Sequence, residues 1–129
     1  MSIDPDLHAL ATAKNFAALS TLAADGQPRT HVMWIDADDE HVVFNTDVSR
    51  AKYRDVQRDA RVTVAVIDQS NPYRYVEARG RVVETIEGDA AADHINSLSQ
   101  RYLGTDYAGD TTTRVIVKIL PDNVHKNGF

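Results

Sequence analysis

Residues 16–36 read FAALSTLAADGQPRTHVMWID and carry the clearest signal of the fold in this chain. Two strand-like stretches, Phe16 to Ala24 and Arg29 to Asp36, flank the pair Asp25-Gly26. A two-residue hairpin turn needs positive φ angles, which aspartate and glycine adopt readily. The stretch therefore predicts an antiparallel β-hairpin.

More strands are predicted after this hairpin. An acidic turn at residues 37–40 leads to a strand from His41 to Thr46. Residues 61–68 are apolar at most positions, which predicts a strand covered on both faces. Short turns between successive strands favour an antiparallel sheet.

The last two strands differ in length. Tyr73 to Glu87 predicts a long strand, in which Gly80 marks the bend that turns a barrel corner. Thr112 to Leu120 predicts a shorter strand, and Pro121 is expected to end it because proline cannot donate a ladder hydrogen bond.

Three helices are predicted around these strands. Asp4 is the expected N-cap of the first and Pro5 its first residue. The second is expected from Ser49, as its cap, to Arg58. The third opens at Gly88-Asp89 and ends at Gly104, with an apolar stripe of Ile95, Leu98 and Tyr102.

This order of elements predicts a mainly β fold. Six or seven antiparallel strands favour closure into a small β-barrel, with the three helices packed outside it. No repeat, linker or low-complexity tract divides the sequence, so residues 1–129 are predicted to form a single domain.

The composition excludes several classes of function. The chain lacks cysteine, so disulfides, thiolate zinc sites and cysteine nucleophiles are excluded. A formal net charge of −5 argues against nucleic-acid binding. No apolar run approaches the roughly 20 residues of a membrane span. Residues 1–6 lack the features of a secretory signal, and we therefore expect a cytoplasmic protein without a membrane partner.

The segment 45–52, NTDVSRAK, carries the main functional signal. It predicts a strand that runs directly into a helix with two cations, Arg50 and Lys52, in its first turn. Cations are mildly unfavourable there, because a helix N-terminus already carries partial positive charge. A bound phosphate would reverse the penalty, assisted by the hydroxyls of Ser49 and Thr46. The commoner alternative is a capped helix whose two cations lie in solvent near Asp47 and Asp55.

Two other segments also allow two interpretations. On a strand, Thr30, Val32 and Trp34 face one way while His31 and Met33 face the other. The only tryptophan either walls a planar ring or fills the barrel or a subunit contact. Residues 71–81 alternate tyrosine and arginine, and they either contact a cofactor or form cross-strand charge pairs. The five histidines show no metal-ligand spacing.

Residues 23–29 with the strand after them, residues 45–52 and residues 71–82 occur in a familiar order, and residues 94–104 add to it. The chain resembles the pyridoxamine-phosphate-oxidase-like split β-barrel superfamily. Within it, the chain is similar to the small F420-dependent reductases, the B group of flavin/deazaflavin oxidoreductases. The resemblance covers nearly the whole sequence.

This resemblance implies a homodimer with a cofactor in the groove between two barrels. It implies that Arg50 and Lys52 hold the cofactor phosphate, assisted by Thr46 and Ser49. It implies that the ring is lined by Thr30, His31, Val32, Met33 and Trp34, with Asn45 as a further cofactor contact. Residues 71–75 are implied either to reach the site from the neighbouring subunit or to flank the groove: Asn71, Pro72, Tyr73, Arg74 and Tyr75.

Likeness to the short subgroup favours coenzyme F420 over FMN. True pyridoxamine phosphate oxidases tend to have adjacent Arg-Lys where this chain has Arg50-Ala51-Lys52. We therefore expect hydride transfer from reduced F420 to an electron-poor substrate such as a quinone or enone, with no catalytic side chain assigned. The alternatives are an FMN-dependent reductase or oxidase, a non-catalytic cofactor carrier, and a barrel with an interaction role only.

Overall fold

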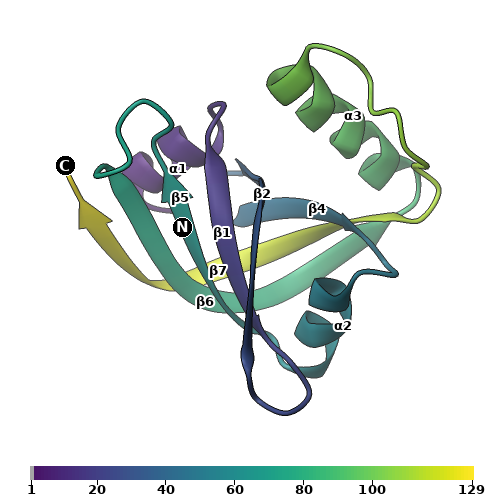
Figure 1. The fold of residues 1–129 in the computed structure, drawn as a ribbon, viewed down its shortest axis with the longest axis horizontal. Helices are drawn as coiled ribbons and strands as arrows, with labels where there is room; N and C mark the ends of the chain where they lie inside the picture. Colours follow the sequence, from purple (N-terminus) through teal and green to yellow (C-terminus); the bar gives the residue numbers. More distant parts are fainter. Residues whose placement is uncertain (1) are drawn as a thin grey trace.

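Seven antiparallel strands form one sheet in the order β2-β1-β5-β6-β7-β4-β3 in the computed structural model, which describes residues 2–129. The sheet curls strongly, and its edge strands β2 and β3 are not hydrogen-bonded to each other (Figure 1). The predicted mainly β fold is confirmed. The strands are β1 Phe16–Leu22, β2 Pro28–Trp34, β3 Asp36–Ala37, β4 Val42–Asp47, β5 Arg61–Ile67, β6 Tyr75–Glu87 and β7 Arg114–Asn127.

Alternate residues of the long strands fill the inside of the curled sheet. They are almost all branched aliphatic side chains, which suit a pleated and buried surface. The largest is Phe44, which is fully buried. The other strand residues of this core are Ala17, Leu19, Val42, Val62, Val64, Val66, Val76, Ala78, Val115, Val117 and Ile119.

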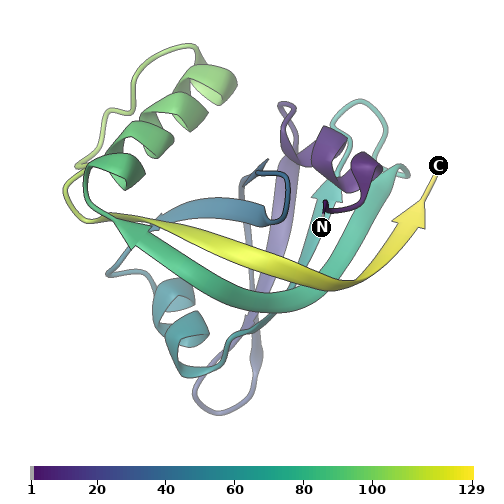
Figure 2. The ribbon, with the colours of Figure 1, turned by 180° about the vertical axis from the view of Figure 1, so that it is seen from behind.

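Three helices complete the fold: α1 Pro5–Ala11, α2 Ala51–Arg58 and α3 Asp89–Leu103. The buried residues of α1 and α2, Leu10 and Val56 among them, join the core of the sheet. In contrast, α3 packs on the outside through two clusters of its own, and it stands apart from the other helices (Figure 2). No helix within residues 2–129 is long and apolar enough to cross a membrane.

The strand β7 passes through Pro121 and ends at Asn127, so the predicted end at the proline is wrong. The register between β6 and β7 shifts at this point, and Pro121 lies opposite Gly80. A Cβ atom on Gly80 would lie 2.2 Å from the Leu120 carbonyl oxygen. The two backbones therefore approach closely at the irregularity, which tolerates proline and requires glycine.

The strand β5 is buried on one face only. Val62, Val64 and Val66 are buried, whereas Thr63 and Ala65 remain partly exposed. The prediction of cover on both faces is therefore wrong within this chain. The outer face of β2, β1 and β5 is turned towards the viewer in Figure 1. Tyr102 of α3 packs on its end at Phe16 and Trp34, and beyond them Val32 is exposed.

Candidate functional site

Two adjoining cavities lie where β2, the start of α2, α3 and β7 meet. The smaller, of about 320 Å³, is lined by Thr30, His31, Val32, Arg50 and Lys52. Because Val32, Arg50 and Lys52 also line the larger cavity of about 350 Å³, we treat the two as one cation groove. The other residues of the larger cavity are Phe16, Met33, Trp34, Asn45, Thr46, Ile95, Leu98, Tyr107 and Arg114.

Three cations, Arg50, Lys52 and Arg114, face this groove without an ion pair. Within residues 2–129, no carboxylate lies within 4 Å of their nitrogens. Of the alternative in which Arg50 and Lys52 are solvated near Asp47 and Asp55, one part holds: Arg50 is exposed, whereas Lys52 is half-buried. Both carboxylates bond other groups. The Lys52 ammonium instead lies 3.9 Å from the sulfur of Met33.

The pKa values of Lys52 and Arg114 are lowered by burial and by neighbouring positive charges. Burial lowers the pKa of Lys52, and the neighbouring charges of Arg50 and Arg114 lower it further. Burial also lowers the pKa of Arg114, although Tyr107 and, at longer range, Asp47 oppose this. The cationic forms are therefore already partly desolvated and repel one another, so an anion in the groove would stabilise them.

His31 responds to the same positive field. Burial lowers its pKa, and the charges of Lys52 and Arg29 add to the effect. The imidazole is therefore held towards its neutral form beside the smaller cavity.

Arg114 was not identified from the sequence. Its Nε donates to the Asn45 Oδ1 at 2.9 Å, and its Nη2 donates to the Asn45 backbone oxygen at 3.3 Å. The Tyr107 ring lies 5.1 Å from the guanidinium carbon and holds it from the other side. Pairing of β4 with β7 brings Arg114 and Asn45 together across 69 residues, and no local pattern signals this contact.

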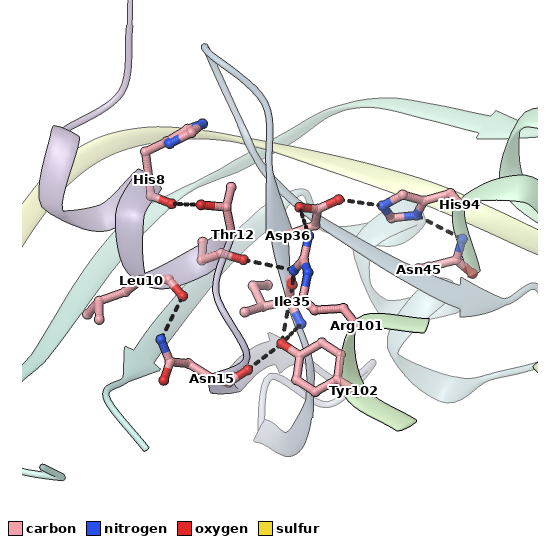
Figure 3. A network of polar contacts seen from close by, with 11 residues as sticks. His8, Leu10, Thr12, Asn15, Ile35, Asp36, Asn45, His94, Arg101 and Tyr102 are labelled. Carbon is pink, nitrogen blue, oxygen red and sulfur yellow. Dashed lines mark hydrogen bonds and ion pairs between the residues drawn. The ribbon is translucent and has the colours of Figure 1, made fainter. Parts of the chain in front are cut away.

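The wall of the groove opposite α2 is apolar. Trp34 stacks on Tyr102 of α3, with ring centroids 5.1 Å apart and planes 5° from parallel. The Tyr102 hydroxyl donates to the Asn15 backbone oxygen and accepts from the Ile35 N–H (Figure 3). Trp34 therefore packs with the α3 cluster and lines the groove, and it is not part of the barrel core.

A polar cluster fastens α3 beside the groove. Asp36 accepts hydrogen bonds from His94 at 2.9 Å and from Arg101 at 2.7 Å, and Asn45 lies on the other side of the imidazole (Figure 3). Burial raises the pKa of Asp36, but the hydrogen bonds from His94 and Arg101 outweigh it and leave the pKa below its ordinary value. The cluster sets the position of Ile95, which lines the groove.

The predicted N-cap of α2 is wrong. Arg50 occupies the N-cap position and makes no side-chain cap bond. The Ser49 N–H and hydroxyl both donate to Asp47, at 2.9 and 2.7 Å. These two bonds hold Ser49 in the turn before the helix, and hydrogen bonds from Thr113 and Ser49 lower the pKa of Asp47 to about 2. Ser49 does not line the groove, although Thr46 does.

Residues 71–75 lie far from the groove within one chain. They form the turn between β5 and β6 and the first residue of β6, next to α1 and on the opposite side from α2 (Figure 1). Arg74 donates to Asp68 at 3.1 Å and stacks over Phe129, while Tyr73 is 79% exposed. The structure therefore does not bring Asn71, Pro72, Tyr73, Arg74 or Tyr75 into contact with the other predicted site residues of the same chain.

A buried carboxylate anchors α2 and thereby positions its cations. Asp55 accepts from Arg29 Nε at 2.8 Å and from Thr21 Oγ1 at 2.8 Å, and Arg58 Nη2 donates to its other oxygen at 3.0 Å. Burial raises the pKa of Asp55, but these hydrogen bonds outweigh it and lower the pKa overall.

Comparison with known proteins places these features in a family context. Residues 3–127 match the family described as pyridoxamine 5'-phosphate oxidase. A solved structure described as an F420 reductase is 31% identical, with a TM-score of 0.82, over 95% of this chain and 98% of that chain. None of the curated proteins matches the chain.

Two more distant structures agree in fold alone. A conserved hypothetical protein from Mycobacterium tuberculosis is 22% identical, with a TM-score of 0.77, over 98% of this chain and 85% of that one. A putative pyridoxamine 5'-phosphate oxidase from Listeria innocua is 18% identical, with a TM-score of 0.68, over 91% and 90% of the two chains.

We predict that Asp55→Asn lowers the free energy of unfolding by about 2 kcal/mol at neutral pH, because an amide group meets a donor where the carboxylate accepts. The lowered pKa of Asp55 means that its contribution is present above about pH 4 and is lost as pH falls through the folded-state value. Urea unfolding measured from neutral to acidic pH should therefore show a shallower acid loss in the variant.

Asp122→Asn is the matched control, since its ion pair with Arg81 is exposed. It should change stability by no more than about 0.5 kcal/mol. An unchanged acid slope in Asp55→Asn would contradict the anchoring role.

Proposed function

Because the chain belongs to the pyridoxamine 5'-phosphate oxidase family, we propose that it is an oxidoreductase that binds coenzyme F420 in the cation groove. Its proposed reaction transfers a hydride from the reduced cofactor to an electron-poor unsaturated substrate, such as a quinone or enone. One observation carries the proposal: Arg50, Lys52 and Arg114 face one groove without a carboxylate partner within the described chain.

The cations suit the phosphate of such a cofactor. Arg50 and Lys52 line both cavities and are two residues apart at the start of α2, so a phosphate between them can contact both. The first-turn N–H groups of α2 have no side-chain cap and add donors at the same place. Thr46 supplies a hydroxyl on the groove side of β4.

The apolar wall suits the ring system. Phe16, Trp34 and Leu98 line the larger cavity, whose volume lies at the small end of the range for ligand pockets. β2 is an edge strand, so alternate backbone groups between Thr30 and Trp34 have no partner strand on one side. These groups can bond the polar edge of a planar ring while the side chains shield its faces.

When bound, a reduced deazaflavin supplies the hydride itself. The chain's own residues then have three tasks: the cations balance the phosphate charge, the edge of β2 orients the ring, and the wall of α3 excludes water. We assign no catalytic side chain. His31 lines the smaller cavity together with Arg50 and Lys52, and its neutral form can accept a hydrogen bond from a ligand.

F420 is proposed over FMN because of one relative. The 31% identical structure is described as an F420 reductase and covers almost all of both chains. FMN is the second candidate, since the groove recognises a phosphate that both cofactors carry. Direct comparison of the two is therefore the decisive binding experiment.

An exposed apolar patch on the sheet supports a homodimer. The outer face of β2, β1 and β5 carries Val32, which is 73% exposed, and Phe16, which is 38% exposed although Tyr102 of α3 packs on it. Ala18 lies opposite both Val32 and Ala65, so the patch is apolar and nearly flat. We propose that a second copy packs here and brings its residues 71–75 towards the groove.

We predict that the purified protein binds F420 more tightly than FMN, measured by fluorescence titration of each. With reduced F420 and a panel of quinones and enones, we expect oxidation of the cofactor coupled to reduction of the substrate. Tighter binding of FMN would replace F420 as the cofactor, and binding without turnover would support a carrier.

The double variant Arg50→Gln/Lys52→Gln should raise the Kd for F420 by about a hundred-fold or more, because two charge-assisted contacts are lost. Its far-ultraviolet circular dichroism should stay native. The control Lys14→Gln/Arg79→Gln removes the same charge from side chains that lie on other strands or loops and do not line the groove. Equal losses in both variants would indicate a general charge effect and overturn the assignment.

Val32→Glu should convert the dimer to a monomer in sedimentation equilibrium, since it buries a charge on each side of the contact. Val83→Glu is the control, because Val83 is also an exposed valine of the sheet but lies outside this patch. A monomeric native protein, or a Val32→Glu variant that stays dimeric, would refute this interface.

A further inference from the structure

The side chain of Asn45 connects the cation groove to the polar cluster that fastens α3. On one side it contacts Arg114 in the cation groove, and on the other it contacts His94 in the cluster that fastens α3. His94 does not line the groove.

The chemistry of the partners fixes the direction of each bond. Arg114 Nε can only donate, so the Asn45 atom 2.9 Å away is its oxygen. The Ala91 carbonyl can only accept, so the atom 3.0 Å from it is the Asn45 amide nitrogen. Two independent contacts therefore exclude the flipped amide.

The orientation of Asn45 then dictates the tautomer of His94. The Asn45 nitrogen lies 3.1 Å from His94 Nδ1 and can only donate, so Nδ1 accepts and carries no proton. The imidazole proton lies on Nε2 and is donated to Asp36 at 2.9 Å. The chain of bonds runs from Arg114 to Asn45, to His94, to Asp36.

We infer that His94 is a positioning residue for the cation groove: only its neutral imidazole lets Asn45 hold Arg114 towards a bound anion. Protonation places an N–H on Nδ1 that points at the Asn45 amide, so two donors face each other. Asn45 cannot flip to relieve this, because Ala91 and Arg114 both oppose it. The amide is displaced, and the Arg114 Nε loses its acceptor.

The charges around His94 do not remove this conflict. Asp36 on β3 accepts the His94 Nε2–H, and Arg101 on α3 shares that carboxylate. Arg114 on β7 stands behind the neutral Asn45 of β4. Lys118 of β7, which lies opposite Val43 of β4, forms an ion pair with Asp38.

This inference rests on the proposed anion site, and it predicts that anion binding weakens as pH falls. An added positive charge near the groove should by itself tighten anion binding as pH falls. Loss of the Asn45 contact should do the opposite. Weaker anion binding on protonation of His94 would therefore identify the hydrogen-bond chain as the dominant effect.

The test uses inorganic sulfate, whose charge is constant between about pH 5.5 and about pH 7.5, where histidine titrates. All proteins carry His31→Asn, which removes the imidazole that lines the groove. Sulfate affinity is read from the Arg114 Nε–H nuclear magnetic resonance signal. The comparison variant is His94→Asn, whose amide oxygen can replace Nδ1 as acceptor but does not titrate.

With His94 present, acidification over this range should raise the Kd for sulfate by about five-fold, the effect of one hydrogen bond. His94→Asn should bind sulfate at neutral pH like its parent and show no such rise. Histidine ring ¹⁵N shifts should also show His94 with its proton on Nε2 at neutral pH, which checks the chain without a ligand.

The outcomes separate the two proposals. Equal pH profiles in both proteins, tighter binding on acidification, or a proton on Nδ1 would overturn the positioning role and leave the anion site standing. Absence of sulfate binding at neutral pH would overturn the anion site, and the positioning role with it.

Discussion

Repulsion between Arg50, Lys52 and Arg114 is the constraint on which the site depends. These three cations face one groove, and within residues 2–129 none has a carboxylate within 4 Å. Burial adds to the unfavourable free energy of this repulsion, because it removes water from Lys52 and Arg114. A fold keeps such an arrangement only when its other contacts hold the charges in place, and an anion then turns the cost into binding energy.

The acidic residues of the chain supply those other contacts. Asp55 anchors α2, Asp47 binds the turn before it, and Asp36 fastens α3. Each is held by hydrogen bonds that lower its pKa, so each stays ionised and occupied at neutral pH. A chain with a net charge of −5 can therefore present a positive groove, because its carboxylates are used in the framework around that groove.

Local patterns predicted most of the fold. The hairpin around Asp25-Gly26 was confirmed, because turn formation depends on residues close in the sequence. Its turn is longer than predicted: Leu22 pairs with Pro28, and Gly26 has a positive φ but Asp25 does not. The errors arose where a distant group changed the outcome. Pro121 continues a strand because β6 shifts register opposite it. Ser49 lies one residue before the cap position, in a turn where it donates to Asp47.

The sequence by itself determined the barrel class and placed Arg50 and Lys52 at the start of the second helix, because strand and helix patterns are local. Only the tertiary structure decided that Arg114 joins them, that Asn45 connects the groove to His94, and that α3 supplies the apolar wall. It also placed residues 71–75 away from the groove of their own chain. The reason is that strand pairing and helix docking unite groups dozens of residues apart, and neither periodicity nor spacing in a single sequence encodes such contacts.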